Sequence, residues 1–145
     1  MTDKAAAAKE WLNRNEDTRI EIHGLLLKLE EMRQAASRLV ASVDDNKVQT
    51  QPDPRRTENK ILRIVEFEEK ICSMRVKLEA SDMVTLETIK RLPNAKERQV
   101  LMYRYYNGLP WGSIACILNY TENYCFELHR DGLEHIADLI DYTVT

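Results

Sequence analysis

The chain has 145 residues and a net charge of −3; 31% of its residues are charged, while glycine and proline occur four times each. This balance is typical of long helices and argues against a β sandwich, which needs many turns. The sequence has no apolar run that spans a membrane and no apolar signal-peptide core, so we expect a cytoplasmic protein without a membrane partner.

The first long segment predicts a helix with a heptad seam. Its apolar residues recur at alternating spacings of three and four, at Ile22, Leu25, Leu29, Met32, Ala36, Leu39 and Val43. Extended towards the N-terminus, the seam passes through Thr18, Asn15 and Trp11, where it is weaker. Gly24 costs a helix about 1 kcal/mol relative to alanine and is a candidate position for a bend.

Residues 44–57, DDNKVQTQPDPRRT, predict a loop, because Pro52 and Pro54 cannot continue a helix. Thr57 is the expected cap of the helix that follows. That helix carries a second seam, formed by Ile64, Phe67, Ile71, Met74 and Leu78. The seam then shifts and resumes at Leu86, Ile89 and Leu92. The shift predicts either a break at 81–82 or a stutter in a continuous helix.

Each seam needs a partner that buries it, and the loop is long enough for the chain to reverse direction. The simplest assembly of residues 1–91 is therefore an antiparallel helical hairpin, that is, a coiled coil. A parallel homodimer through either helix is the alternative that the sequence leaves open.

Residues 92–145 predict a second domain of three shorter helices. Asn94 is the expected cap of the first helix, which ends at the Asn-Gly pair 107–108, because both residues tolerate left-handed backbone. Pro110 stands where the second helix can begin, and the third is expected from Glu122 to about residue 141. The apolar faces are expected to comprise Val100, Leu101, Tyr105, Ile114, Ala115, Leu118, Cys125, Leu128, Leu133, Ile136 and Ile140.

A tight turn at 119–121, with Thr121 as helix cap, joins the last two helices, which is the layout of a helix-turn-helix. Such a fold places the start of its last helix in a DNA groove. We name the outward side of that helix the recognition face; it comprises Glu122, Asn123, Phe126, Glu127 and Arg130. Asparagine and glutamate can read bases by hydrogen bonds, and phenylalanine can touch a thymine methyl group.

Trp111, Ser113 and Thr121 complete the candidate DNA-binding set. Trp111 either stacks on sugar-phosphate or packs under the turn, and packing is favoured because large aromatic residues dominate small cores.

An ordered set of residues in this region matches a known pattern, namely Val100-Leu101, Arg104-Tyr105, Gly108-Leu109, Trp111, Ile114-Ala115, Leu118, Tyr120-Thr121, Leu128-His129 and Leu133. The pattern resembles the region-4 domain of bacterial sigma-70 factors. It is more similar still to small phage and prophage regulators that carry this domain, including late-gene activators of the RinA and ArpU kind. The motif covers roughly a third of the chain. The resemblance implies a phage-derived regulator that binds double-stranded DNA at promoters, with or through RNA polymerase, in a bacterial host cell.

The chain departs from the sigma pattern in ways that affect charge. Pro110 replaces a serine or threonine, Gly112-Ser113 replaces acidic residues, and Asn119 replaces the turn glycine. Basic residues typical of the sigma recognition helix are here Glu122, Tyr124 and Phe126. From residue 93 to the end, four Lys and Arg face seven Asp and Glu. Since phosphate neutralisation supplies much of DNA affinity, we expect this module alone to bind DNA weakly.

Neither a metal site nor a catalytic site is expected. Cys72, Cys116 and Cys125 lie on or near apolar stripes, and we interpret them as small core residues in a reducing compartment. Cys125 and His129 form the one cysteine–histidine pair at i, i+4 spacing, and no Cys-x-x-Cys occurs. The sequence has no Gly-rich phosphate loop and no nucleophile–base motif, so we expect no enzyme and no cofactor.

Two functions remain open at this point. The first is a DNA-binding transcription regulator whose coiled coil forms a homodimer or contacts a partner. The second is a structural or adaptor protein that does not bind DNA and uses the helix-turn-helix and the seams as protein-interaction surfaces. Phe126 surrounded by Glu122 and Glu127 suits a protein interface as well as a DNA groove.

Overall fold

The computed structural model describes residues 2–45 and 54–144. Within these ranges the chain is helical and contains no strand, which confirms the predicted all-α class. The elements in chain order are α1 (Asp3–Leu12), α2 (Glu16–Asp45), α3 (Pro54–Lys90), α4 (Ala95–Leu101), the π-helix η1 (Met102–Tyr106), α5 (Trp111–Leu118) and α6 (Glu122–Val144). No helix in the described part of the chain is long and apolar enough to cross a membrane.

The contacts group the chain into two compact units. Unit 1 consists of residues 1–16 and 79–145, and unit 2 consists of residues 17–78. The contacts thus place the N-terminal helix and the end of α3 with the three C-terminal helices, whereas the sequence-based division lay between residues 91 and 92. The difference arises because α1 packs against α6.

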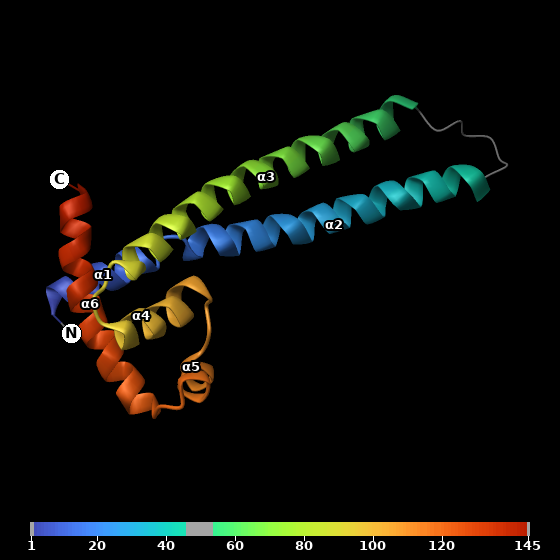
Figure 1. Ribbon diagram of the computed structural model, residues 1–145. Helices are drawn as coiled ribbons and strands as arrows, with labels where there is room; N and C mark the ends of the chain where they lie inside the picture. Colours follow the sequence, from blue (N-terminus) through green and yellow to red (C-terminus); the bar gives the residue numbers. More distant parts are fainter. Residues whose placement is uncertain (1, 46–53, 145) are drawn as a thin grey trace. The chain divides into compact units, whose positions relative to one another are not determined.

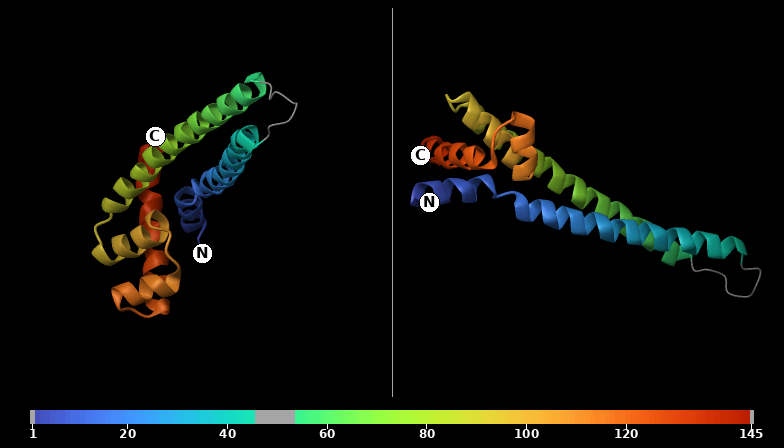
Figure 2. Two further views of the ribbon diagram at one scale, coloured as in Figure 1. Left: turned by 90° about the vertical axis from the view of Figure 1, so that its right-hand side faces the viewer. Right: turned by 90° about the horizontal axis from the view of Figure 1, so that it is seen from below.

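Unit 2 is built from α2 and the first part of α3, which run in opposite directions (Figures 1 and 2). Both predicted seams contribute to its core, which consists of Ile22, Leu29 and Ile71, with Leu25, Leu26, Ile64, Phe67, Met74 and Leu78 packed around them. Arg33 and Glu68 form an ion pair of 2.8 Å between the helices.

The predicted loop is shorter at both ends than expected. α2 continues to Asp45, and α3 begins at Pro54, so Thr57 lies inside α3 and its predicted role as helix cap is wrong. Proline suits the first helical turn, because a backbone N–H at that position would have no hydrogen-bond partner within the helix. The rest of the predicted loop, 46–53, lies outside the described residues.

The first predicted helix is interrupted, which corrects the backward extension of its seam. α1 ends at Leu12, and α2 begins at Glu16. Thr2 caps α1 by accepting a 3.1 Å hydrogen bond from the backbone N–H of Ala5. One side of α1 is buried because the small side chains of Ala5 and Ala8, with Leu12, pack against α6.

A polar network fixes the short segment between α1 and α2. Asn15 is 9% exposed; its amide donates to Asp82 (3.2 Å) and accepts from the Ser81 hydroxyl (3.0 Å). The Arg14 guanidinium donates to the carbonyl oxygens of Trp11 and Ser81. α3 continues through residues 81–82 without interruption. Of the two predictions for this stretch, the stutter in a continuous helix is therefore confirmed and the helix break is wrong.

α6 is the central helix of unit 1. The first core cluster lies between α1, the end of α3, α4, η1 and the second half of α6; it comprises Ala5, Ala8, Leu12, Ile89, Leu92, Leu101, Tyr105, Leu133, Ile136 and Ala137. The second lies between α4, α5 and the start of α6; it comprises Val100, Ile114, Ala115, Cys125 and Leu128. A Cβ atom on Gly132 would lie 2.9 Å from Leu101 Cδ1, so glycine permits α4 and α6 to pack this closely.

Candidate nucleic-acid interface

The turn between α5 and α6 has the geometry that its residues predict. Asn119 adopts left-handed backbone angles (φ 57°, ψ 44°), which asparagine tolerates better than other side-chain-bearing residues. The Tyr120 N–H donates to the Ala115 carbonyl at 3.0 Å. Thr121 caps α6 through its hydroxyl, which accepts from the Tyr124 N–H at 3.1 Å. These bonds fix the direction in which α6 leaves the turn.

The start of α6 separates its residues into a buried and an exposed side. All five residues of the recognition face are exposed, and they are Glu122, Asn123, Phe126, Glu127 and Arg130. On the opposite side, Cys125 and Leu128 are buried against α4 and α5. Burial and the nearby Glu122 carboxylate raise the pKa of the Cys125 thiol. Cys125 is thus the core residue that was predicted, whereas Cys72 and Cys116 are exposed and that prediction is wrong for them.

Trp111 occupies the start of α5 and packs sideways onto α6. Its ring makes edge contacts with Phe126 (centroids 5.1 Å apart) and His129 (4.8 Å). The Arg104 guanidinium lies 4.8 Å from the centroid of the indole ring. Trp111 is half-buried and packs against the second core cluster.

The other predicted residues lie apart from this aromatic contact. Ser113 is half-buried, and its backbone N–H bonds to the carbonyl of Pro110. A Cβ atom on Gly112 would lie 3.4 Å from Glu122 Oε1, so this carboxylate leans back over α5. Arg130 Nε lies 3.9 Å from Asp131 Oδ1.

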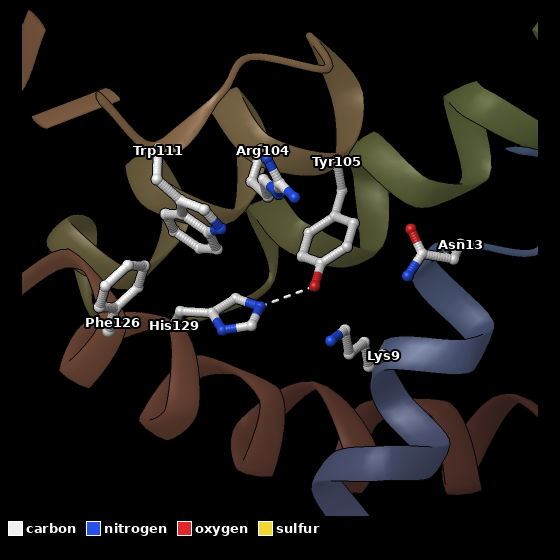
Figure 3. A pocket seen from close by; sticks show the side chains of 7 residues that line it. All are labelled: Lys9, Asn13, Arg104, Tyr105, Trp111, Phe126 and His129. Atoms are coloured by element: carbon white, nitrogen blue, oxygen red, sulfur yellow. Dashed lines mark hydrogen bonds between the residues drawn. The ribbon is translucent and has the colours of Figure 1, made fainter. Parts of the chain in front are cut away.

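Beside the recognition face lies a pocket that the sequence did not reveal. We name it the Lys9–Arg104 pocket; its volume is about 270 Å³ and its lining consists of Lys9, Asn13, Arg104, Tyr105, Trp111, Phe126 and His129 (Figure 3). Figure 3 shows the Lys9 side chain extending from α1 towards the ring of His129. The sequence does not predict the pocket, because α1, which completes it, lies far along the chain from η1, α5 and α6.

Tyr105 and His129 form the polar centre of this pocket. The Tyr105 hydroxyl lies 2.6 Å from His129 Nε2. Burial lowers the pKa of His129 to about 4, assisted by the positive charges of Lys9 and Arg104. Burial also raises the pKa of Tyr105 to about 12, against the opposing effect of Arg104. At neutral pH both groups are therefore uncharged. We assign the Tyr105 hydroxyl as the donor and His129 Nε2 as the acceptor, because a phenol is more acidic than the N–H of a neutral imidazole.

A second buried polar contact lies further along α6. Glu97 is 3% exposed, and its Oε2 atom lies 2.9 Å from His135 Nδ1. Glu97 lies in the first turn of α4 between Lys96 and Arg98, and nothing in the local sequence pattern distinguishes it from these two charges. In the described part of the chain, no three His, Cys, Asp or Glu side chains are grouped so that they can hold a metal ion.

Comparison with known proteins adds no relative: no family model matches the chain, and no curated protein or solved structure matches it significantly.

Proposed function

We propose that this chain is a DNA-binding transcription regulator in which α5, the turn at Asn119 and α6 form a helix-turn-helix of the sigma region-4 kind. The observation that carries the proposal is the combination of a left-handed turn residue, a capped start of α6 and an exposed recognition face. In such a fold the first turns of the last helix meet base edges in the major groove. Asn123 is the residue best suited to read a base, by two hydrogen bonds to adenine.

The proposal assigns α2 and α3 to assembly. Residues of both seams share one core in unit 2, which supports the interpretation as an antiparallel coiled-coil hairpin. Within the described residues of unit 2, both helices carry large exposed apolar side chains, which are Ile20, Leu27, Ile61, Leu62, Val65 and Val76. Such residues support a role in contacting a partner, either a second copy or a bacterial RNA polymerase. The resemblance to phage and prophage late-gene activators favours a function at promoters in the host cytoplasm, without catalysis.

A specific observation also favours the adaptor function. Phe126 is 42% exposed and lies between Glu122 and Glu127 on the recognition face. An exposed aromatic ring between carboxylates suits a basic protein partner, whereas carboxylates repel DNA phosphates.

A mobility-shift assay across a salt series, with fragments of the neighbouring genome, tests the proposal. We expect one fragment to shift specifically, with a shallow salt dependence, because the recognition face brings few cations. The double variant Asn123→Ala, Arg130→Ala should lose the specific shift and keep its helicity. The matched control Gln99→Ala, Arg91→Ala removes one amide and one arginine from exposed positions elsewhere in unit 1 and should bind normally.

The assay separates the two functions. If the folded wild-type protein shifts no fragment even at low salt, the DNA-binding proposal fails. If Phe126→Ala then abolishes binding to purified RNA polymerase, the adaptor function replaces it.

A further inference from the structure

The Lys9–Arg104 pocket is lined by side chains from four elements of unit 1. α1 supplies Lys9, Asn13 directly follows α1, η1 supplies Arg104 and Tyr105, α5 supplies Trp111, and α6 supplies Phe126 and His129. Among these described residues there are two permanent cations and no carboxylate. A concave site with this lining has a positive potential and attracts anions.

The two cations are not neutralised inside the pocket. Arg104 is held in place by its hydrogen bond to the Leu109 carbonyl (3.1 Å) and by the Trp111 ring, and neither partner is an anion. A guanidinium has five N–H donors, so donors remain for a ligand. Lys9 is exposed, and Figure 3 shows its ammonium near His129 and Tyr105. Burial is the main cause of the low pKa of His129, and the positive charges of Lys9 and Arg104 lower it further.

The remaining walls are aromatic. Trp111 and Phe126 meet edge to face, and Trp111 meets His129 in the same way, so apolar ring surface borders the cations. Tyr105 and Asn13 add polar groups that can orient a ligand. Ligand pockets usually enclose about 300–1,000 Å³, so a volume of about 270 Å³ limits the occupant to a small molecule.

We propose that the Lys9–Arg104 pocket binds a small single-ring aromatic anion. Its carboxylate or phosphate group lies between Lys9 and Arg104, and its ring packs against Trp111 and Phe126. Charge-assisted hydrogen bonds from an arginine and a lysine are the strong contacts in such a site, and the ring contacts select an aromatic body. The proposal does not depend on DNA binding.

Titration of the full-length protein with sodium benzoate, followed by NMR of the indole N–H groups, tests this site directly. The Trp111 signal is assigned with the variant Trp111→Phe, which distinguishes it from Trp11. We expect benzoate to shift the Trp111 signal along a saturable curve. Benzyl alcohol and benzylamine, which have the ring without the negative charge, should bind at least about tenfold more weakly. Acetate and inorganic phosphate, which have the charge without the ring, should also bind at least about tenfold more weakly.

Variants of the two cations separate binding from folding. Lys9→Gln changes an exposed side chain and should lower benzoate affinity about tenfold with an unchanged unfolding midpoint. Arg104→Lys keeps the charge but loses the planar fork, and it should weaken benzoate binding while the fold is retained. The matched control Lys90→Gln, at the exposed end of α3, should bind benzoate like the wild type.

Three outcomes overturn the proposal. The first is the absence of a saturable shift with benzoate. The second is equal binding of benzyl alcohol, which would show a merely apolar cavity. The third is undiminished benzoate affinity in Lys9→Gln. Binding of phosphate as tight as that of benzoate overturns the aromatic half of the proposal and points to a plain anion site.

Discussion

The Tyr105 hydroxyl and His129 Nε2 lie 2.6 Å apart and join η1 to α6 beside the recognition face. The contact connects a core residue, Tyr105, with the helix that carries the exposed residues of the candidate interface. Its two partners are neutral at pH 7 because burial disfavours the charged form of each. A change in the protonation of His129 is therefore also a change in the stability of unit 1.

We predict that acid destabilises the protein through His129. Its pKa is about 4 in the folded protein and about 6.5 when unfolded, so the unfolded state binds more protons between these values. The contribution of neutral His129 to the free energy of unfolding is complete above about pH 6.5 and is lost as the pH falls towards about 4. Urea denaturation at pH 7.0, 5.5 and 4.5 should show this loss of unfolding free energy.

The variant His129→Asn isolates the histidine from the many carboxylates that also titrate in acid. It should be less stable at pH 7 and should lose less stability on acidification than the wild type. Parallel pH profiles of the two proteins would show that other groups are responsible for the acid sensitivity.

We predict opposite effects for alanine at two helical glycines. Gly132→Ala should destabilise the protein by about 1–3 kcal/mol, because the new methyl group meets the buried Leu101 side chain. Gly24→Ala should stabilise it by up to about 1 kcal/mol. The added Cβ atom would have no atom within 4 Å beyond the neighbouring backbone of its own helix, and alanine favours the helix. Denaturant titration of both variants measures the contrast, and destabilisation by Gly24→Ala would contradict the described course of α2.

We predict that Asn119 is replaceable by glycine and not by alanine. Its left-handed conformation costs an alanine about 1–2 kcal/mol, whereas glycine adopts it freely. Thermal unfolding should therefore rank Asn119→Gly close to the wild type and Asn119→Ala below it. Asn123→Ala, on the exposed recognition face, is the matched control and should unfold like the wild type.

We predict that two of the three thiols react quickly with a thiol-modifying reagent and that the third reacts slowly. Cys72 and Cys116 are exposed, while Cys125 is fully buried and its thiol pKa is raised by burial and by Glu122. Because the thiolate is the reactive form, an aromatic disulfide reagent should modify two thiols promptly and the third only on unfolding. Cys125→Ser should remove the slow phase, and three equally fast thiols in the folded protein would contradict the burial of Cys125.

The sequence predicted those features of the fold that local patterns determine. Asn94 accepts from the N–H groups of Lys96 and Glu97 at the start of α4, as a helix-capping asparagine should. Thr121 and Asn119 likewise have the predicted cap and turn conformations. Apolar periodicity also identified part of the core of unit 2, since a helix buries positions three and four apart. The predicted residues that lie in this core are Ile22, Leu25, Leu29, Ile64, Phe67, Ile71, Met74 and Leu78.

Features that depend on distant contacts were not predictable in this way. The interruption at 13–15 is stabilised by Ser81 and Asp82, which lie on another helix. A heptad pattern that fades at Asn15 is an ambiguous signal without that partner. The Lys9–Arg104 pocket likewise needs α1 beside α6, and no local pattern in Lys9 or His129 indicates that contact.

The packing of α1 on α6 has a consequence for how the chain can be divided and how it folds. Ala5, Ala8 and Leu12 cover apolar residues of α6, so a fragment that begins at residue 92 would expose that surface to water. The C-terminal helices are thus no self-sufficient module to transplant, and a fusion protein should carry α1 as well. During synthesis α1 leaves the ribosome well before its partner α6, because α2 to α5 are made between them. Unit 1 must therefore close late, by a contact between distant parts of the chain, and such closures are slow steps in folding.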